Sequence, residues 1–443
     1  MLQQIGRKIK ETEAVILLKD ASFPAFFYDG LQYSPPARGT WNIVHTNMLV
    51  PESHQIYICA LGCLRGVVLT AAEMGAMNRF SSIVIEEHHL YDGTMEDVII
   101  DAVGDILDNL RPYVPKACFI YPSCVHHFMG CDMDTIYQRL RETYGQTKFV
   151  ACWMDPIRRE SKLTAEMRTR QQVYSLLQKK ALRPHDVNIV GSNLAIQEDC
   201  ELVSLLHENH IVLHQLPTCN TYEAYEQMAA SFLNIGQEPL AKGCLADMKQ
   251  RLGQESLYLS NSWNIDEIEQ NLQDVAACLH ISCPSYADKK RQCEDALAQT
   301  RKYVNDIPIA IDYTAVMRPF SLARLLLSHG FAVERIYADT ANPEDEADFY
   351  WIQSQYPQLQ VYATRHADMR CLVRTTKEPI LAIGQKAAYF TGTKHFVNIV
   401  EGGGLRDYTG ILRLMELLRE AYDTEKEAKS CISRKGWGCA SCL

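Results

Sequence analysis

Short apolar runs of β type alternate with longer helix-like segments along almost the whole chain, and this alternation constrains the fold more than any other feature. Several of the runs end at a glycine or a polar turn, where the next helix-like segment begins. Strand and helix in alternation predict βαβ units with parallel sheets. We expect strands at 56–60, 82–86, 117–121, 148–152, 187–191, 211–216, 256–260, 307–312, 331–337, 359–363, 379–384 and 396–400.

The intervening segments predict helices at 94–111, 134–144, 164–181, 223–234, 265–279, 285–305 and 319–330. At 443 residues the chain is too long for one ordinary domain. A polar connection around 153–165 and the long helix at 285–305 divide it into units of similar βαβ character. We therefore predict an α/β protein of three Rossmann-like, doubly wound domains with parallel sheets around a central cleft. The domains are expected at 1–155, 156–304 and 305–420, with a helix end and a Cys-rich tail at 421–443.

Charge and motif content exclude several classes of function. The net charge of −10 and the lack of a long basic block argue against nucleic acid as the main partner. The sequence has no apolar run of about eighteen residues, so no membrane span is expected. The N-terminal segment has no signal-peptide core, which favours a cytoplasmic protein. Neither GxGxxG nor GxxxxGK[ST] occurs, so we expect no nucleotide hydrolysis by the chain itself.

Sixteen cysteines are many for a cytoplasmic chain. In a reducing cell, surplus thiols bind metals, take part in redox chemistry or fill cores. Cys59 and Cys63 follow one expected strand, and Cys124 follows another. Because such strand ends share one edge of a parallel sheet, we expect Cys63 and Cys124 to converge. Thiolates in loops with free backbone N–H groups suit an iron–sulfur cluster, whose sulfurs those groups can bond.

Other interpretations of these cysteines stay open. The CxxxC spacing of Cys59 and Cys63 is not specific, and both residues would also fit core positions. Cys131 is a weaker candidate for a fourth ligand. The tail fits either a metal-carrying or redox-active segment or a disordered terminus with reduced thiols. Its cysteines are Cys431, Cys439 and Cys442.

Taken together, these features resemble the nitrogenase component 1 superfamily, which includes nitrogenase α and β subunits, cofactor-assembly scaffolds and dark-operative protochlorophyllide reductases. The similar segments are "IYICALGCLRG", "YDGTMEDVIIDAVGDIL", "FIYPSCVHHFMGCDMD", "VNIVGSN" and "GGLRDYTGILRLMELL". The resemblance places Cys63 and Cys124 at cluster ligands. A further cluster cysteine of the family falls at "PARGTWNIV", where this chain has Thr40. Either Cys59 supplies the missing thiolate or the cluster is differently ligated.

The resemblance implies a reductase subunit that receives electrons from a separate P-loop iron–sulfur ATPase reductase. A 4Fe-4S or P-cluster-like centre at the three cysteines would pass them to a small molecule or tetrapyrrole in the cleft. It also implies a homodimer or a heterotetramer with a related subunit, and leaves room for a second metallocluster. Gln237 and Glu238 stand near the metallocluster cysteine of nitrogenase α, and His395 lies near its histidine. We therefore expect a nitrogenase-like reductase rather than nitrogenase itself.

Six residues are expected to bind a cofactor in the cleft, because cationic side chains and glycine-rich turns favour anionic groups. They are Arg65, Lys394, His395, Gly402, Gly403 and Gly404. The alternatives are a satisfied core or surface histidine at 395 and a simple tight turn at the glycines. Two other functions remain open for the chain. One is a non-catalytic scaffold for metallocluster assembly and transfer, and the other is a metal-free α/β binding protein.

Overall fold

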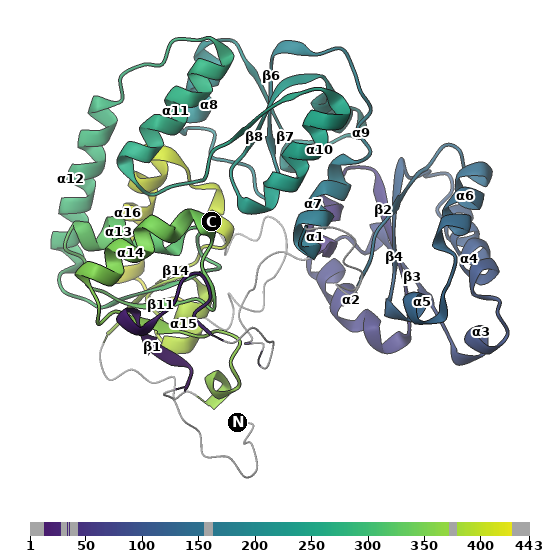
Figure 1. The fold of residues 1–443 in the computed structure, drawn as a ribbon, viewed down its shortest axis with the longest axis horizontal. Helices are drawn as coiled ribbons and strands as arrows, with labels where there is room; N and C mark the ends of the chain where they lie inside the picture. Colours follow the sequence, from purple (N-terminus) through teal and green to yellow (C-terminus); the bar gives the residue numbers. More distant parts are fainter. Residues whose placement is uncertain are drawn as a thin grey trace.

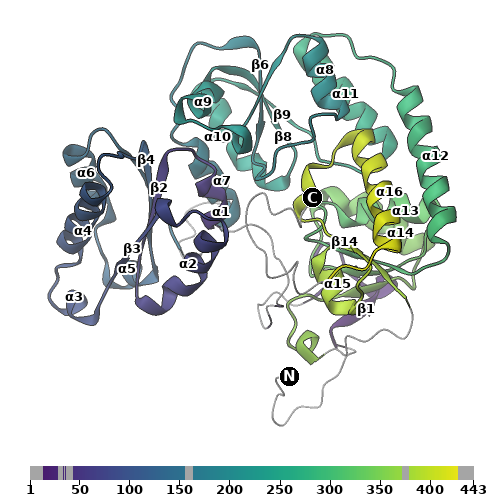
Figure 2. The same ribbon diagram turned by 180° about the vertical axis from the view of Figure 1, so that it is seen from behind.

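The structure is a computed structural model that describes residues 13–27, 33, 35, 43–154, 163–371 and 379–427. Figure 1 shows three sheets with helices packed around them, and Figure 2 shows the same arrangement from behind. A strand lies at or within a few residues of each of the expected positions. The predicted α/β class with Rossmann-like parallel sheets is therefore confirmed.

The first unit is a parallel sheet in the order β3-β2-β4-β5. Its strands are β2 (Ser53–Cys59), β3 (Phe80–Val84), β4 (Ala117–Pro122) and β5 (Lys148–Ala151). Alternation along β2 sends Tyr57 and Cys59 to one core and Ile56 and Ile58 to the other. The first core is covered by α1 (Ile43–Met48) and α2 (Leu64–Glu73), and the second by α4 (Met95–Asn109) and α6 (Met133–Thr143). Two short helices, α3 (Glu87–Tyr91) and α5 (Cys124–Met129), follow β3 and β4.

The second unit is a parallel sheet in the order β7-β6-β8-β9. Its strands are β6 (Arg183–Val190), β7 (Val212–Gln215), β8 (Ser231–Gly236) and β9 (Glu255–Tyr258). Its helices are α7 (Ala165–Tyr174), α8 (Glu201–Glu208), α9 (Tyr222–Gln227), α10 (Lys242–Leu252) and α11 (Ile265–Leu279). Val173 and Tyr174 at the end of α7 share a core with the first unit, so this helix joins the two units.

Strand β8 corrects the sequence analysis, which extended a helix over 223–234. The helix α9 ends at Gln227, and Ser231–Gly236 forms a strand between β6 and β9. Leu233 and Ile235 are fully buried, and Asn188 on β6 donates to Asn234 across the sheet at 2.7 Å. Burial on both faces of the sheet therefore favours a strand here, although the preceding residues have a helical pattern. The helix expected at 164–181 likewise ends earlier, at Tyr174.

The third unit is a six-stranded sheet in the order β1-β12-β11-β10-β13-β14. Its strands are β1 (Val15–Leu17), β10 (Ile309–Asp312), β11 (Val333–Tyr337), β12 (Gln360–Tyr362), β13 (Leu381–Ile383) and β14 (Phe396–Val397). Its helices are α12 (Ala287–Val304), α13 (Pro319–Ser328), α14 (Glu346–Gln355), α15 (Gln385–Thr391) and α16 (Asp407–Asp423). The edge strand β1 is antiparallel to β12, with Val15 opposite Tyr362. Residues 15–17, which the sequence analysis grouped with the first unit, thus extend the sheet of the third.

The second and third units share one continuous hydrophobic core, which runs from Ile189 and Leu233 to Ile311 and Leu414. The first unit stands to one side of this pair in both views, with α7 and α1 at the junction (Figures 1 and 2). Among the described residues, no helix is both long and apolar enough to span a membrane. The carboxyl ends of strands from the second and third units meet where these units adjoin, which is where open α/β sheets bind ligands.

Candidate functional site

The connections that carry Cys63 and Cys124 leave the first sheet side by side. Strands β2 and β4 are neighbours, and Ile58 lies opposite Pro122 at their carboxyl ends. Cys63 ends the short turn after β2 and directly precedes α2, whereas Cys124 is the first residue of α5. Cys63 is exposed and Cys124 is half-buried. The parallel register therefore brings both thiols to one edge of the sheet, as the strand pattern predicts.

Cys59 is the last residue of β2 and is fully buried. Burial, with smaller contributions from the thiols of Cys63 and Cys124, raises the pKa of its thiol to about 12. As the last residue of β2, Cys59 lies at the same sheet edge as the connections that carry Cys63 and Cys124. A thiol with so high a pKa stays protonated in neutral water and is deprotonated only when a metal takes the place of the proton. The donor set, three soft sulfurs from two adjacent loops and a strand end, fits an iron–sulfur cluster.

Other cysteines of the first unit do not belong to this set. Cys131 packs in the opposite core, with its sulfur 3.9 Å from that of Met133, and burial and Glu96 raise its pKa to about 12. Cys118 and Cys152 are fully buried. These residues match the interpretation of cysteine as core filler. Thr40 and the tail cysteines Cys431, Cys439 and Cys442 lie outside the described residues.

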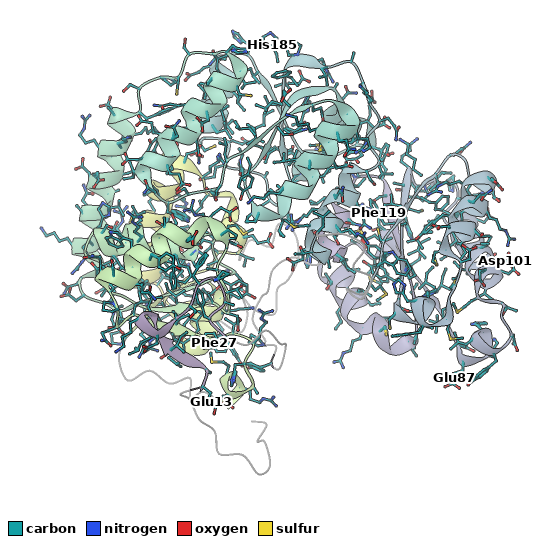
Figure 3. All side chains as sticks on the ribbon, viewed as in Figure 1. Glu13, Phe27, Glu87, Asp101, Phe119 and His185 are labelled. Carbon is teal, nitrogen blue, oxygen red and sulfur yellow. The ribbon has the colours of Figure 1, made fainter. Side chains whose placement is uncertain are left out.

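Apolar side chains stand in solvent beside the exposed thiol. Leu61 is 72% exposed in the turn that leads to Cys63, and Phe128 is 74% exposed in the helix that starts at Cys124. Met129, next in the chain, is also exposed. In Figure 1, α5 and α3 lie at the same end of the first unit. Figure 3 shows Glu87 of α3 at this end and Phe119 inside the unit. Grouped exposed apolar residues of this kind are typical of a surface that another protein covers.

The structure separates the six residues expected in the cleft. His395 precedes β14, and its Nδ1 lies 3.0 Å from the carbonyl oxygen of Ala421. Lys394 is exposed and pairs with Glu425 at 3.1 Å. Both therefore lie at the amino end of β14, whereas Gly402, Gly403 and Gly404 follow its carboxyl end. Arg65 is exposed on α2 of the first unit. Of the six, Gly404 lines a cavity between the second and third units.

A cavity of about 290 Å³ lies where the second and third units meet α7. Loops that follow the carboxyl ends of β8, β10, β11 and β12 contribute to its wall, as does the first turn of α7. Its polar lining includes Glu166, Tyr313, Asp339, Thr340, Asn342 and Arg365, and its apolar lining includes Pro239, Leu240 and Met317. None of the described residues in this wall is Cys or His. Sequence reasoning missed these residues, although the strand ends that carry most of them were predicted.

Hydrogen bonds fix the orientation of the polar lining. Asp339 accepts the backbone N–H groups of Thr364 at 3.1 Å and Arg365 at 3.2 Å. Lys386 lies 3.0 Å from the Tyr313 hydroxyl. Burial raises the pKa of Glu166 despite the influence of nearby Arg170. The cavity thus offers a carboxyl group that holds its proton more tightly than usual, together with cationic hydrogen-bond donors.

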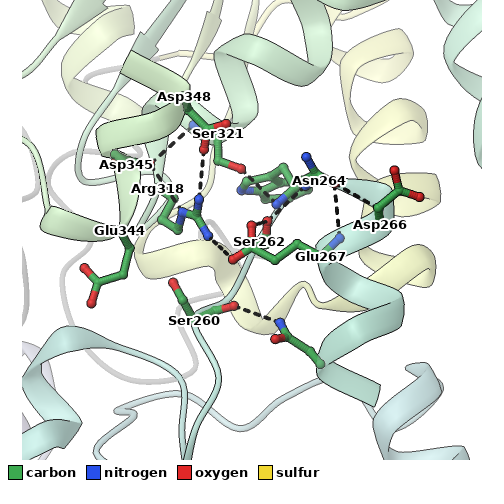
Figure 4. A network of polar contacts seen from close by, with 12 residues as sticks. Ser260, Ser262, Asn264, Asp266, Glu267, Arg318, Ser321, Glu344, Asp345 and Asp348 are labelled. Atoms are coloured by element: carbon green, nitrogen blue, oxygen red, sulfur yellow. Dashed lines mark hydrogen bonds and ion pairs between the residues drawn. The ribbon is translucent and has the colours of Figure 1, made fainter. Parts of the chain in front are cut away.

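A buried network of charges ties α11 to α13 and α14 beside this cavity (Figure 4). The Arg318 guanidinium precedes α13 and lies 2.7 Å from Glu267, 2.8 Å from Asp348 and 3.3 Å from Asp345. Burial raises the pKa of Asp345 to about 7, against the effect of Arg318. Arg318 is 5% exposed, and it pairs with two almost fully buried carboxyls, Asp345 and Asp348, and with the partly exposed Glu267. This network fixes the position of Met317, which lines the cavity next to it.

Glu13, His366 and Asp368 form a further group that is able to hold a single metal ion. Their ligand atoms lie within 4.8 Å of one another. Glu13 precedes β1, and the other two residues follow the adjacent strand β12. Figure 3 shows Glu13 on the third unit, away from Glu87 and Phe119 of the first. Carboxylate and imidazole ligands suit harder ions than the three thiols do.

These features define an α/β protein with a thiol-rich sheet edge in one unit and a ligand-sized cavity where the others meet. The model of the family described as nitrogenase component 1 type oxidoreductase matches residues 54–423, and the chain belongs to this family. No curated protein matches its sequence.

Two solved structures show the same fold. One, titled "Nitrogenase Cp1 at pH 6.5", is 12% identical, with a TM-score of 0.67 over 89% of this chain and 94% of that one. The other, "Nitrogenase Cp1 at pH 5", is 14% identical, with a TM-score of 0.61 over 93% and 94%.

Proposed function

We propose that the chain is the electron-accepting subunit of a nitrogenase-like reductase and that it reduces a substrate in the cleft between its units. The observation that carries this proposal is the gathering of Cys59, Cys63 and Cys124 at one sheet edge, in a member of an oxidoreductase family. The lack of a P-loop motif in the sequence agrees with ATP hydrolysis by a separate iron–sulfur reductase, which would supply the electrons.

Cys59, Cys63 and Cys124 are the residues that would hold the 4Fe-4S or P-cluster-like centre. When bound, such a cluster stores and passes on single electrons. The buried strand end at Cys59 lowers the local dielectric, and the turns that carry the other two thiols offer backbone N–H groups. Three thiolates from one chain leave a ligand position for a second chain. This supports a site at the interface of a homodimer or of a heterotetramer with a related subunit.

The exposed apolar residues beside Cys63 give this interface a direct test. We expect Phe128→Glu to weaken subunit association by about 10-fold or more, because a charge replaces a large apolar side chain at the proposed contact. Val212→Glu, at a position 51% exposed on the second unit, is the matched control. Light scattering over a dilution series, on the chain alone and on the chain co-expressed with a related subunit, measures the effect. Equal mass distributions for the two variants would contradict the interface.

The residues of the cavity support a polar substrate of modest size. A volume of about 290 Å³ lies at the lower end of ligand sites, which favours a small molecule over a tetrapyrrole. Arg365 and Lys386 provide positive charge, and Tyr313 provides a hydroxyl group that Lys386 orients. Glu166, an exposed residue with a raised pKa, provides a carboxyl group in the wall of the cavity.

Anaerobic purification with iron and sulfide analysis tests the proposal first. We expect both elements to be bound, with charge-transfer absorbance in the visible range. Values near zero would rule out both the reductase and the scaffold and leave a metal-free binding protein. The second step is reduction of the protein by a P-loop iron–sulfur reductase with ATP. Electron uptake that requires ATP, followed by turnover of a small-molecule substrate, is the expected result.

The alternative function is a non-catalytic scaffold for the assembly and transfer of a metallocluster. Tail cysteines suit delivery of a cluster, and they lie outside the described residues. The cavity gives this alternative less support, because the described residues of its wall include neither Cys nor His. Gln237 and Glu238 directly follow β8 near the position at which a metallocluster cysteine was sought. Transfer of iron from the chain to a second protein, without substrate turnover, would favour the scaffold.

A further inference from the structure

A group of metal-ligating side chains lies where the N-terminal strand joins the third sheet. Glu13 directly precedes β1, and His366 and Asp368 follow the adjacent strand β12. Among the described residues, this is the one group of three such side chains whose ligand atoms all lie within 4.8 Å of one another. None of the three residues is a cluster thiol or lines the large cavity. The group is therefore separate from the proposed cluster and substrate sites.

Backbone hydrogen bonds fix the chain on which these residues stand. The Ala363 N–H donates to the carbonyl oxygen of Ala14 at 2.9 Å, which joins the start of β1 to the end of β12. On the β11 side, Asp339 accepts the N–H groups of Thr364 at 3.1 Å and Arg365 at 3.2 Å. The stretch that leads to the ligand residues is therefore held by both neighbouring strands.

The spacing of the ligand atoms matches a small divalent cation. Nδ1 of His366 lies 3.8 Å from Oδ2 of Asp368. Nitrogen and oxygen ligands about 2.1 Å from one metal ion are themselves roughly 3–4 Å apart, so both atoms can reach the same ion. The same nitrogen accepts the Asp368 N–H at 3.2 Å. It is therefore unprotonated, which is the state that metal binding requires.

The three side chains differ in exposure and in chemistry. Asp368 is only 4% exposed, His366 is half-buried and Glu13 is exposed. The first two therefore provide fixed ligands, and the Glu13 side chain is free to adjust to an ion from the solvent side. One imidazole and two carboxylates suit first-row divalent ions such as Mn²⁺, Fe²⁺ and Zn²⁺. The three thiols of the first unit suit softer centres.

The N-terminal segment also contacts the stretch that lines the large cavity. The Tyr33 N–H donates to the carbonyl oxygen of Arg365 at 2.9 Å, and Arg365 lines that cavity. His366 is the next residue in the chain. An ion bound to both Glu13 and His366 would therefore hold β1 against the Arg365 stretch, although more than 300 residues separate the two in the chain.

We propose that Glu13, His366 and Asp368 bind one first-row divalent metal ion, which fastens the N-terminal strand to the stretch that carries Arg365. β1 has only three residues, and a short edge strand near a chain terminus opens easily. An ion that binds only when the strand is docked shifts the equilibrium toward docking. The site needs no iron–sulfur cluster, so this inference goes beyond the proposed reductase and does not depend on it.

Binding of Mn²⁺ to the full-length protein, after treatment with a chelator, tests the site. Mn²⁺ prefers oxygen and nitrogen ligands to thiolates, and electron paramagnetic resonance counts the free ion. We expect one Mn²⁺ per wild-type chain and binding that is weaker by about 100-fold or more in Asp368→Asn. His214→Gln is the matched control, because its imidazole lies 2.9 Å from Asp186 but this pair belongs to no group of three ligand residues in the described part of the chain. No saturable binding by the wild type, or equal affinity in Asp368→Asn, would overturn the site.

Glu13→Gln keeps the test decisive if Asp368→Asn does not fold. Glu13 is exposed, so an amide at this position disturbs no core. We expect the affinity for Mn²⁺ to fall about 10-fold or more, and an unchanged affinity would overturn the link to the N-terminal strand. Cys63→Ala should bind Mn²⁺ as the wild type does. Loss of Mn²⁺ binding in that variant would place the ion at the thiols and contradict the proposal.

Hydrogen exchange measures the consequence for β1. The N–H groups of Leu18 and Ala363 donate to the carbonyl oxygens of Leu359 and Ala14, so they report whether β1 is docked on β12. We expect saturating Mn²⁺ to slow their exchange about 10-fold or more in the wild type and to have no effect in Glu13→Gln. Equal exchange with and without Mn²⁺ in the wild type would refute the fastening of the strand. A protein that binds Mn²⁺ as expected but contains no iron or sulfide would refute the proposed reductase and leave this metal site in place.

Discussion

Cys63→Ala is expected to lose nearly all bound iron, and Cys59→Ala is expected to lose almost as much. Cys63 is the exposed thiol of the set, and Cys59 is the buried one, whose pKa is raised mainly by burial. If Cys59 is a cluster ligand, its removal leaves a cluster with one ligand fewer in a chain that has no cysteine before it. Iron, sulfide and visible absorbance per chain, measured on anaerobically purified protein, give the result.

Cys118→Ala is the matched control for this experiment. Cys118 is also a fully buried strand cysteine, but it lies on the neighbouring strand and faces the opposite core. We expect the Cys118→Ala variant to keep its iron and to be only slightly less stable, because a small buried side chain is lost. Full iron retention in Cys59→Ala would show that Cys59 is a core residue and not a ligand. Full retention in Cys63→Ala would refute the cluster site.

Arg318→Met is expected to lower the free energy of unfolding by about 3–5 kcal/mol, because it leaves buried carboxylates without their cation. The loss should be larger at pH 8 than at pH 5.5. Asp345 has a folded-state pKa raised to about 7, so at the lower pH it is protonated and needs no partner. A raised carboxyl pKa lowers stability as pH rises through the range between its unfolded and folded values. Removing Arg318 strengthens this trend. Urea unfolding at the two pH values provides the measurement.

Arg324→Met is the control on the same helix and removes the same charge. Arg324 lies 3.0 Å from Asp348, but its side chain is 32% exposed, so water screens the pair. We expect a loss of less than about 1 kcal/mol with little dependence on pH. Equal losses for the two variants would show that burial of Arg318 among its carboxyls has no special role.

The sheet order of the first unit explains why the shared edge of Cys63 and Cys124 was predictable from the sequence. Each strand has a clear apolar run, and parallel pairing then brings Cys63 and Cys124 to one edge without further information. The strand β8 was missed because Ser231 directly follows a helical pattern with no glycine or proline between them. Likewise, β1 is short and pairs with a strand more than 300 residues later in the chain. The local sequence pattern shows neither where the helix before β8 ends nor which distant strand β1 pairs with.

The cleft was less predictable because its residues come from different units. Glu166, Asp339 and Arg365 are ordinary charged residues in sequence, and only the fold brings them into the wall of one cavity. His395 shows the opposite error. It was expected at a strand end that faces the cleft, whereas it precedes β14 and lies at the opposite sheet edge from the glycine turn. A residue reaches the cleft only if it lies at the carboxyl end of its strand and not at the amino end.

The antiparallel edge strand β1 has a consequence for biogenesis. Residues 15–17 are synthesised before every other described strand, yet their partner β12 is among the last of these strands to be made. Residues 43–258, which form the first two sheets, can pack while synthesis continues, whereas β1 must wait as an unpaired apolar segment. Until it docks, β12 presents an open edge to which other chains can add. The time between release from the ribosome and the docking of β1 is therefore the period in which the chain is most exposed to aggregation.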